Sequence, residues 1–136
     1  MRKIVVIDGQ GGKIGRELCD RILERMDFVD LIAISTNSAA TANMLKGKAI
    51  QGATGENPVV VACRDADVVA GPIGIVIADS LLGEITPLMA KAVGQSRAEK
   101  VLIPVNRCSN HVVGIKSLSV NEMIDEAIDL IEGLVK

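Results

Sequence analysis

Short apolar runs alternate with segments of mixed polarity along most of the chain. The first run, in residues 3–8, places Ile4, Val5, Val6 and Ile7 in succession without a polar interruption. An uninterrupted apolar run of this length predicts a strand that is covered on both faces, as in a parallel sheet. Similar runs predict further strands at residues 30–35, 49–50, 67–70 and 101–105.

The segments between these runs carry apolar residues at helical spacing. Leu18, Ile22 and Met26 fall on one face, which predicts a helix packed on a sheet. Asn57 followed by Pro58 predicts another helix start, because asparagine caps helices and proline favours their first position. On these grounds helices are predicted at residues 16–26, 39–46, 58–65, 75–94 (interrupted at Thr86-Pro87) and 119–134, the last with the capping box Ser119-x-x-Glu122.

This order of elements predicts a single Rossmann-like α/β domain over residues 1–136. Alternating strands and helices fold into three layers, with a mainly parallel sheet and helices on both of its faces. Residues 111–115 form one more apolar run, shortly after the preceding strand. A connection that short suits an antiparallel pair, so we expect a C-terminal β-hairpin strand there.

Glycine and small polar residues follow the predicted strands. Loops that follow parallel strands gather at the carboxyl edge of the sheet, where ligands bind in such folds. We therefore expect these loops to line one rim. The candidate binding residues are Gly9, Gln10, Gly11, Gly12, Lys13, Ile14, Gly15, Ser35, Thr36, Asn37, Ser38, Thr54, Gly55, Glu56, Asn57, Gly71, Pro72, Ile73, Gly74, Asn106 and Arg107.

The first of these loops has glycines spaced as in a phosphate-binding turn. Gly9, Gly12 and Gly15 follow a strand and open a helix, so free N–H groups and the helix dipole can face an anion. A strict Gly-x-Gly-x-x-Gly motif would need glycine where Gln10 stands. The loop resembles that of extended short-chain dehydrogenases and dihydrodipicolinate reductases, where a basic residue also lies near Lys13. The alternative is a turn chosen only for tight packing of the strand on the helix.

Two features argue against ordinary NAD binding. The second predicted strand ends in Ser35-Thr36-Asn37-Ser38, without the acidic residue that binds a ribose diol. These side chains could hold a 2′-phosphate, although no arginine follows to neutralise it, and Asp8 would lie beside a pyrophosphate. A P-loop is excluded because no Gly-Lys-Ser/Thr occurs, and S-adenosylmethionine is disfavoured. The cofactor is left open between NAD(P) and another nucleotide.

Carboxylates near the expected rim are the candidates for chemistry. Asp8, Glu56, Asp79 and Glu84 could each act as a general base or hold a metal with a ligand phosphate. The alternative for Glu56 is a charge at a helix N-terminus, and for Asp79 and Glu84 it is a solvated helix face. We favour these alternatives and assign no catalytic residue and no metal site.

Composition narrows the function classes. A net charge of −2 with scattered basic residues, and Phe28 as the only aromatic residue, argue against nucleic-acid binding. With His111 as the only histidine and no tyrosine, a multi-histidine zinc site and a tyrosine-based dehydrogenase are excluded. No apolar run is long enough to span a membrane, and no signal peptide is recognised. Widely spaced Cys19, Cys63 and Cys108 fit free thiols, so a cytoplasmic protein is expected.

Five longer stretches carry a further resemblance. They are VVIDGQGGKIG (5–15), STNSAAT (35–41), GATGEN (52–57), GPIGIVIADSLLGEITP (71–87) and LIPVNRC (102–108). Together they resemble a small uncharacterised bacterial family, a domain of unknown function with single-domain members of about this length. The resemblance implies a Rossmann-like fold in a bacterial cytoplasmic protein, and it transfers no catalytic residue.

The leading hypothesis is binding of a nucleotide or other phosphorylated small molecule at the carboxyl edge. One alternative is a small oligomeric enzyme whose site is completed by a second subunit, using Asp79, Glu84, Glu56 or Arg107. Another is a regulatory or scaffold module without chemistry. Residues 73–89 carry more apolar side chains than one small domain easily covers, so we expect a homodimer.

Overall fold

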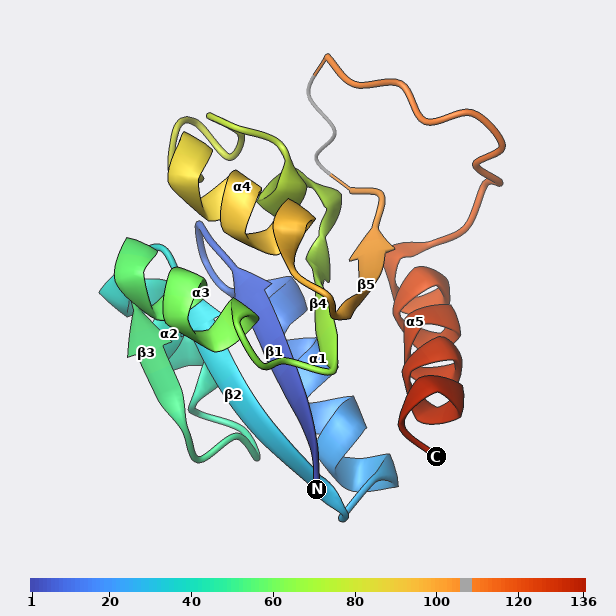
Figure 1. The fold of residues 1–136 in the computed structure, drawn as a ribbon. Helices are drawn as coiled ribbons and strands as arrows, with labels where there is room; N and C mark the ends of the chain where they lie inside the picture. The colour runs from blue at the N-terminus through green and yellow to red at the C-terminus, as the bar shows by residue number, and fades with distance from the viewer. Residues whose placement is uncertain (106–108) are drawn as a thin grey trace.

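Five parallel strands form one sheet in the order β3-β2-β1-β4-β5 (Figure 1). The computed structural model describes residues 1–105 and 109–136. The strands are β1 (Arg2–Asp8), β2 (Val29–Ser35), β3 (Gly52–Thr54), β4 (Val68–Pro72) and β5 (Glu99–Ile103). The helices are α1 (Lys13–Arg25), α2 (Ser38–Met44), α3 (Glu56–Cys63), α4 (Pro87–Gln95) and α5 (Val120–Val135), with a 3₁₀ helix, η1 (Ile73–Val76). This is the doubly wound, Rossmann-like α/β fold that the sequence predicts.

The central strand β1 is buried on both faces, which explains its uninterrupted apolar run. Ile4 and Val6 pack into a core that also contains residues of α1, α2 and α5. Val5 and Ile7 pack into the opposite core, with residues of α3 and α4. Helices therefore cover both faces of the sheet, and apolar burial on each face is its main source of stability.

The predicted C-terminal hairpin strand is wrong. Residues 111–115 are in no strand, and all five strands of the sheet are parallel. Gly114 has a φ of 86°, which interrupts an extended run, and Val113 is 98% exposed. Helix α5, through residues such as Ile124 and Ile128, covers one face of the sheet beside β5, and residues 111–115 do not join the sheet.

Two other elements begin at residues that differ from the prediction. The third strand is Gly52–Thr54 and not residues 49–50. Helix α3 begins at Glu56, after Gly55, whose φ of 110° suits only glycine, so Asn57 lies inside the helix and does not cap it.

The stretch predicted as a helix from residue 75 is mostly irregular. Residues 77–86 form successive turns, and Asp79, Leu81 and Leu82 have positive φ values that no α-helix accommodates. We call residues 77–86 the covering segment. Only α4 is helical here, and Thr86 caps it as predicted by accepting the N–H of Met89 at 3.1 Å.

Burial also removes the reason for expecting a dimer through residues 73–89. Ile75, Leu81, Ile85 and Met89 are buried in the chain's own core, although Leu82 is 95% exposed. The homodimer itself stays a prediction.

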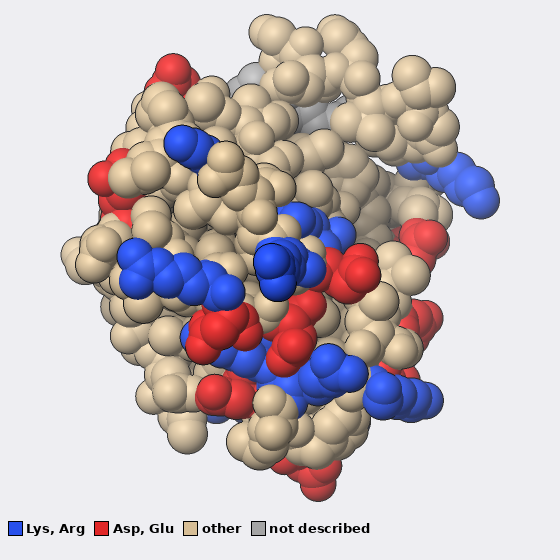
Figure 2. All heavy atoms as spheres, in the orientation of Figure 1, with Lys and Arg blue, Asp and Glu red and all other residues tan. Residues whose placement is uncertain are grey.

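Charges of both signs are mixed on the surface. Figure 2 shows basic and acidic side chains interspersed on one face of the molecule. Ion pairs join several of them, including Lys3 with Asp65 and Arg21 with Asp125. None of the helices in the described ranges has the length and apolar character needed to cross a membrane.

The capping box of α5 allows a test of local stability. Ser119 Oγ accepts the N–H of Glu122, and the Glu122 side chain accepts the N–H of Ser119. We expect Ser119→Ala to lower the free energy of unfolding by about 1 kcal/mol in urea denaturation. Ser117→Ala, at an exposed position outside the helix, is the control and should change little. Equal effects of the two substitutions would contradict the capping role.

Candidate functional site

The strand order reverses between β1 and β4, and the carboxyl edge opens there. Strand β1 pairs with β4 only from Ile4↔Val68 to Val6↔Ala70, whereas it pairs with β2 as far as Asp8↔Ser35. A Cβ at Gly71 would lie 2.2 Å from the carbonyl oxygen of Ile7, so only glycine fits where the two strands part. Ligands bind at such a switch point in doubly wound sheets.

Asp8 closes the loop between β1 and α1 from inside. Asp8 is buried, with only 6% of its surface exposed to solvent. Oδ1 accepts the N–H of Gly9 at 2.8 Å, and Oδ2 accepts the N–H of Gly15 at 2.7 Å. Burial raises the pKa of the Asp8 carboxyl, the two N–H donors oppose this, and the nearby Glu84 charge adds to the rise. Asp8 therefore ties the end of the strand to the first turn of the helix.

Packing explains three of the four loop glycines. A Cβ at Gly12, which has a φ of 74°, would lie 2.6 Å from the carbonyl oxygen of Ala40 in α2. A Cβ at Gly15 would lie within 3 Å of Met44 and Asp8. Gly9 is similarly crowded by the covering segment. Gly11 is different, because it is exposed and nothing lies within 4 Å of its Cβ position.

The first turn of α1 keeps free hydrogen-bond donors. Its N-cap residue, Gly12, offers no side chain to accept them. In the described part of the chain, the backbone N–H groups of Gly11, Lys13 and Ile14 donate to no protein atom. With the positive end of the helix dipole, these donors can bind an anion approaching over Gly11.

The covering segment brings Glu84 onto this loop. Glu84 Oε1 accepts hydrogen bonds from the N–H of Gln10 at 2.8 Å, Thr36 Oγ1 at 2.5 Å and Asn37 Nδ2 at 3.0 Å. Burial is the largest single influence on the pKa of Glu84 and raises it, but the three donors together outweigh it and hold the pKa below its ordinary value. The carboxylate of Glu84 thus lies at the end of β2, although residues 35–38 that follow this strand include no acidic residue.

The predicted environment of Glu84 is wrong. We expected a solvated helix face, and the structure gives an irregular turn whose carboxylate bonds to two distant loops. No local pattern indicates these contacts, because they join residues far apart in the chain. The neighbouring residue is Gly83, a residue type that favours turns over helices. Its φ of 87° in the structure is one that glycine adopts readily.

The β2 loop contacts the first loop directly. Asn37 caps α2 by accepting the N–H of Ala40 at 2.9 Å, and its Nδ2 also donates to the carbonyl oxygen of Gln10 at 3.0 Å. Ser35 Oγ donates to the carbonyl of Asn37 at 2.9 Å. Ser38 is exposed at the start of α2. The structure therefore brings together the first two of the predicted loops.

The β3 loop lies on the far side of β2. The hydroxyl of Thr54 is 2.7 Å from that of Thr41, and the N–H of Gly55 donates to the carbonyl of Ser35 at 2.8 Å. Glu56 Oε2 accepts from Thr86 Oγ1 at 2.5 Å, and Asn57 is exposed on α3. These residues adjoin the β2 loop and the end of the covering segment, not the free amides of α1.

The β4 loop lies beneath the covering segment. Gly71, Pro72 and Gly74 are buried, Ile73 is half-buried, and Ser80 Oγ donates to the carbonyl of Gly74. These residues support the segment and do not line an open rim.

Other candidates fall outside this site. Asn106, Arg107 and Cys108 lie outside the described residues. Asp79 is exposed, and His111 is exposed beyond β5.

The two described cysteines are free and buried. Burial raises the pKa of the Cys19 thiol to about 12 and also raises that of Cys63, so both are poor nucleophiles. Over residues 1–105 and 109–136, no group of three histidine, cysteine or acidic side chains is placed to hold a metal ion.

Alanine substitutions in the first loop test whether crowded glycines stabilise the fold more than an exposed one does. Gly12→Ala combines a positive φ with a contact to the Ala40 carbonyl, so we expect it to lower the free energy of unfolding by at least about 2 kcal/mol. Gly11→Ala is the matched control and should change it by less than about 0.5 kcal/mol. Chemical denaturation measures both, and a Gly11→Ala protein as unstable as Gly12→Ala would refute this account.

Glu84 should leave a signature in the pH dependence of stability. Because its pKa is lower in the folded state, its contribution is present above the pKa of the unfolded chain and is lost as the pH falls through the folded pKa. We expect Glu84→Gln to be less stable at neutral pH and to lose less stability in acid than the wild type. Glu24→Gln, at an exposed carboxylate on α1, should retain the wild-type profile. Superimposable profiles for wild type and Glu84→Gln would contradict the three hydrogen bonds.

Comparisons with known proteins place the chain in a family. No curated protein matches it. Among solved structures, it is similar to a dodecameric FMN-dependent UbiX-like decarboxylase from Escherichia coli O157:H7, with 18% sequence identity over 98% of this chain and 76% of that chain, and a TM-score of 0.45. The model of one protein family matches residues 3–136, and the chain therefore belongs to the family described as Domain of unknown function (DUF3842).

Proposed function

We propose that this protein binds a nucleotide or another phosphorylated small molecule at the carboxyl edge of its sheet, with a phosphate over Gly11 at the start of α1. The observation that carries this proposal is the set of three free N–H donors, on Gly11, Lys13 and Ile14, beside the switch point. Gly11 is exposed and uncrowded, so an anion can reach these donors without displacing the covering segment. The exposed ammonium of Lys13 supplies positive charge at the same turn.

The neighbouring groups suit a sugar. Glu84 Oε1 is occupied by three donors, whereas Oε2 accepts no hydrogen bond within the described chain. That free oxygen can accept from a ribose hydroxyl, as an acidic residue at the end of the second strand does in dinucleotide-binding sheets. Here the carboxylate comes from the covering segment and not from β2.

The same carboxylate selects among nucleotides. A 2′-phosphate near Glu84 would place two anionic groups together, and the described contacts of Glu84 include no arginine that would neutralise them. The arrangement therefore favours ligands with a free ribose diol over their 2′-phosphorylated counterparts.

The proposal is limited to binding. Glu56 bonds to Thr86, and within the described residues neither Glu56 nor Asp79 forms a hydrogen bond with Glu84.

Calorimetric titration with NAD(H), NADP(H), ATP, GTP, FMN and S-adenosylmethionine tests this function. We expect NAD to bind more tightly than NADP, and Lys13→Ala to weaken nucleotide binding about tenfold through the lost phosphate charge. Lys48→Ala, at the opposite edge of the sheet, is the matched control and should leave affinity unchanged. Glu84→Gln should narrow the preference for NAD over NADP.

Two results would overturn the proposal. One is the absence of heat and of a thermal shift with every ligand. The other is equal loss of affinity in Lys13→Ala and Lys48→Ala, which would place the phosphate elsewhere.

A further inference from the structure

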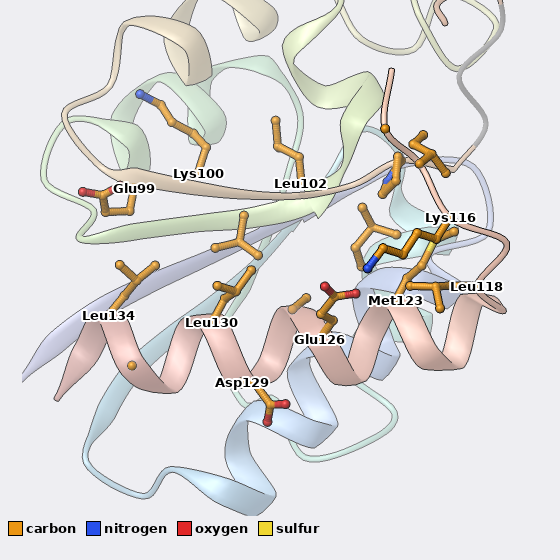
Figure 3. A pocket seen from close by; sticks show the side chains of 17 residues that line it. Glu99, Lys100, Leu102, Lys116, Leu118, Met123, Glu126, Asp129, Leu130 and Leu134 are labelled. Carbon is orange, nitrogen blue, oxygen red and sulfur yellow. The ribbon is translucent and has the colours of Figure 1, made fainter. Parts of the chain in front are cut away.

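A groove of about 750 Å³ runs between β5 and α5 at the outer edge of the sheet (Figure 3). Leu130 and Leu134 of α5 point towards the strand, and Leu130 is 58% exposed. Met123 and Leu118 line the opposite end. An apolar groove beside an open strand edge is an unusual feature for a protein surface, because exposed edges tend to pair with other strands.

The open edge of β5 offers a small and defined set of backbone groups. The N–H of Glu99 donates to the carbonyl of Asp67 at 3.0 Å, so Glu99, Val101 and Ile103 direct their backbone groups to β4. Lys100 and Leu102 alternate with them and direct theirs outward. Their backbone groups have no partner in residues 1–105 and 109–136.

We infer that a second copy of this chain occupies this edge, with the two β5 strands antiparallel about a two-fold axis at Val101. In that register Lys100 of each copy lies opposite Leu102 of the partner subunit. Opposed residues that exchange both N–H···O bonds form the hydrogen-bonded pairs of an antiparallel ladder. Every outward group of Lys100 and Leu102 in both strands then has a partner. A two-fold interface requires a patch that is complementary to itself, and this edge satisfies that condition.

The charges at the ends of the groove support the same symmetry. Glu99 lies at one end and Lys116 at the other (Figure 3). Neither forms an ion pair within the described ranges. The two-fold axis places Glu99 of the partner subunit opposite Ile103, at the end that holds Lys116. Glu99 of each copy therefore comes to the end of the partner's groove that holds Lys116, twice in the dimer.

The apolar side chains complete the interface. Val101 and Ile103 face α5, so Val101 meets its own copy on the axis on that side of the sheet. The exposed Leu130 and Leu134 of both copies flank this pair and lose contact with water. An unrelated peptide would lack the paired charges, which is why the groove favours a second copy.

Light scattering after size exclusion tests the charge pairing. We expect a dimer for the wild type, and a shift towards monomer for Glu99→Lys and for Lys116→Glu alone. The double variant Glu99→Lys with Lys116→Glu should recover the dimer, because the charges again alternate across the axis. Recovery would exclude misfolding as the cause of the single-variant effects. A monomeric wild type, or single variants that dimerise as well as it does, would overturn the inference.

A cysteine placed on the axis tests the register. A disulfide requires Cα atoms about 4.4–6.8 Å apart, which a directly opposed antiparallel pair provides. In a Cys108→Ser chain, we expect Val101→Cys to form a covalent dimer under mild oxidation. Val61→Cys, exposed on α3 away from this edge, is the control and should not. A dimer that cross-links through position 61 and not through 101 would refute the β5 interface.

Discussion

The carboxylate of Asp8 is the constraint on which the site depends. It accepts the N–H groups of Gly9 and Gly15 and so fixes the turn between β1 and α1. An unpaired carboxylate at this depth would be costly, and two N–H donors offset part of that cost. The consequence is that Gly15 is satisfied from inside the protein, while Gly11, Lys13 and Ile14 keep their donors towards solvent. An acidic residue that reads as unfavourable for phosphate binding thus shapes a loop able to bind one.

Glu84 joins this loop to the rest of the rim. It connects Gln10 to Thr36 and Asn37 across the first two loops, and its segment lies directly on Gly9. The segment adopts positive φ at Leu81 and Leu82, a conformation that non-glycine residues take at a cost. Burial of Leu81 and Ile85 and the hydrogen bonds of Glu84 oppose that cost. The position of this carboxylate is therefore set by tertiary contacts and not by local preference.

Much of the fold could be predicted from sequence, because burial on two faces leaves a direct pattern. The run Ile4–Ile7 and the stripe of Leu18, Ile22 and Met26 each reflect one dominant environment. Secondary-structure prediction failed in two segments where apolar residues do not share one buried environment. Within residues 77–86, the buried Leu81 and Ile85 are four positions apart, as on one face of a helix, but turns position them. Residues 111–115 are apolar without being buried.

In the candidate site too, features with a local sequence pattern could be predicted, and features set by distant contacts could not. The glycine loop was visible because strand, turn and helix are consecutive in sequence. Crowding at Gly9, Gly12 and Gly15 shows that close packing against neighbouring segments also requires glycine at these three positions. The role of Glu84 and the burial of Gly71–Gly74 depend on how distant segments meet, which residue spacing along the chain does not encode.

The location of the inferred interface bears on the choice between binding protein and enzyme with a shared site. The switch point lies between β1 and β4, and β5 lies on the outer side of β4. A two-fold axis that makes β5 antiparallel to its copy turns the carboxyl edges of the two sheets in opposite directions. The Gly11 loops of the two copies then open at opposite ends of the dimer. Neither copy can supply a side chain to the other's rim, so a dimer formed through β5 is compatible with two independent ligand sites and incompatible with a site completed across that interface.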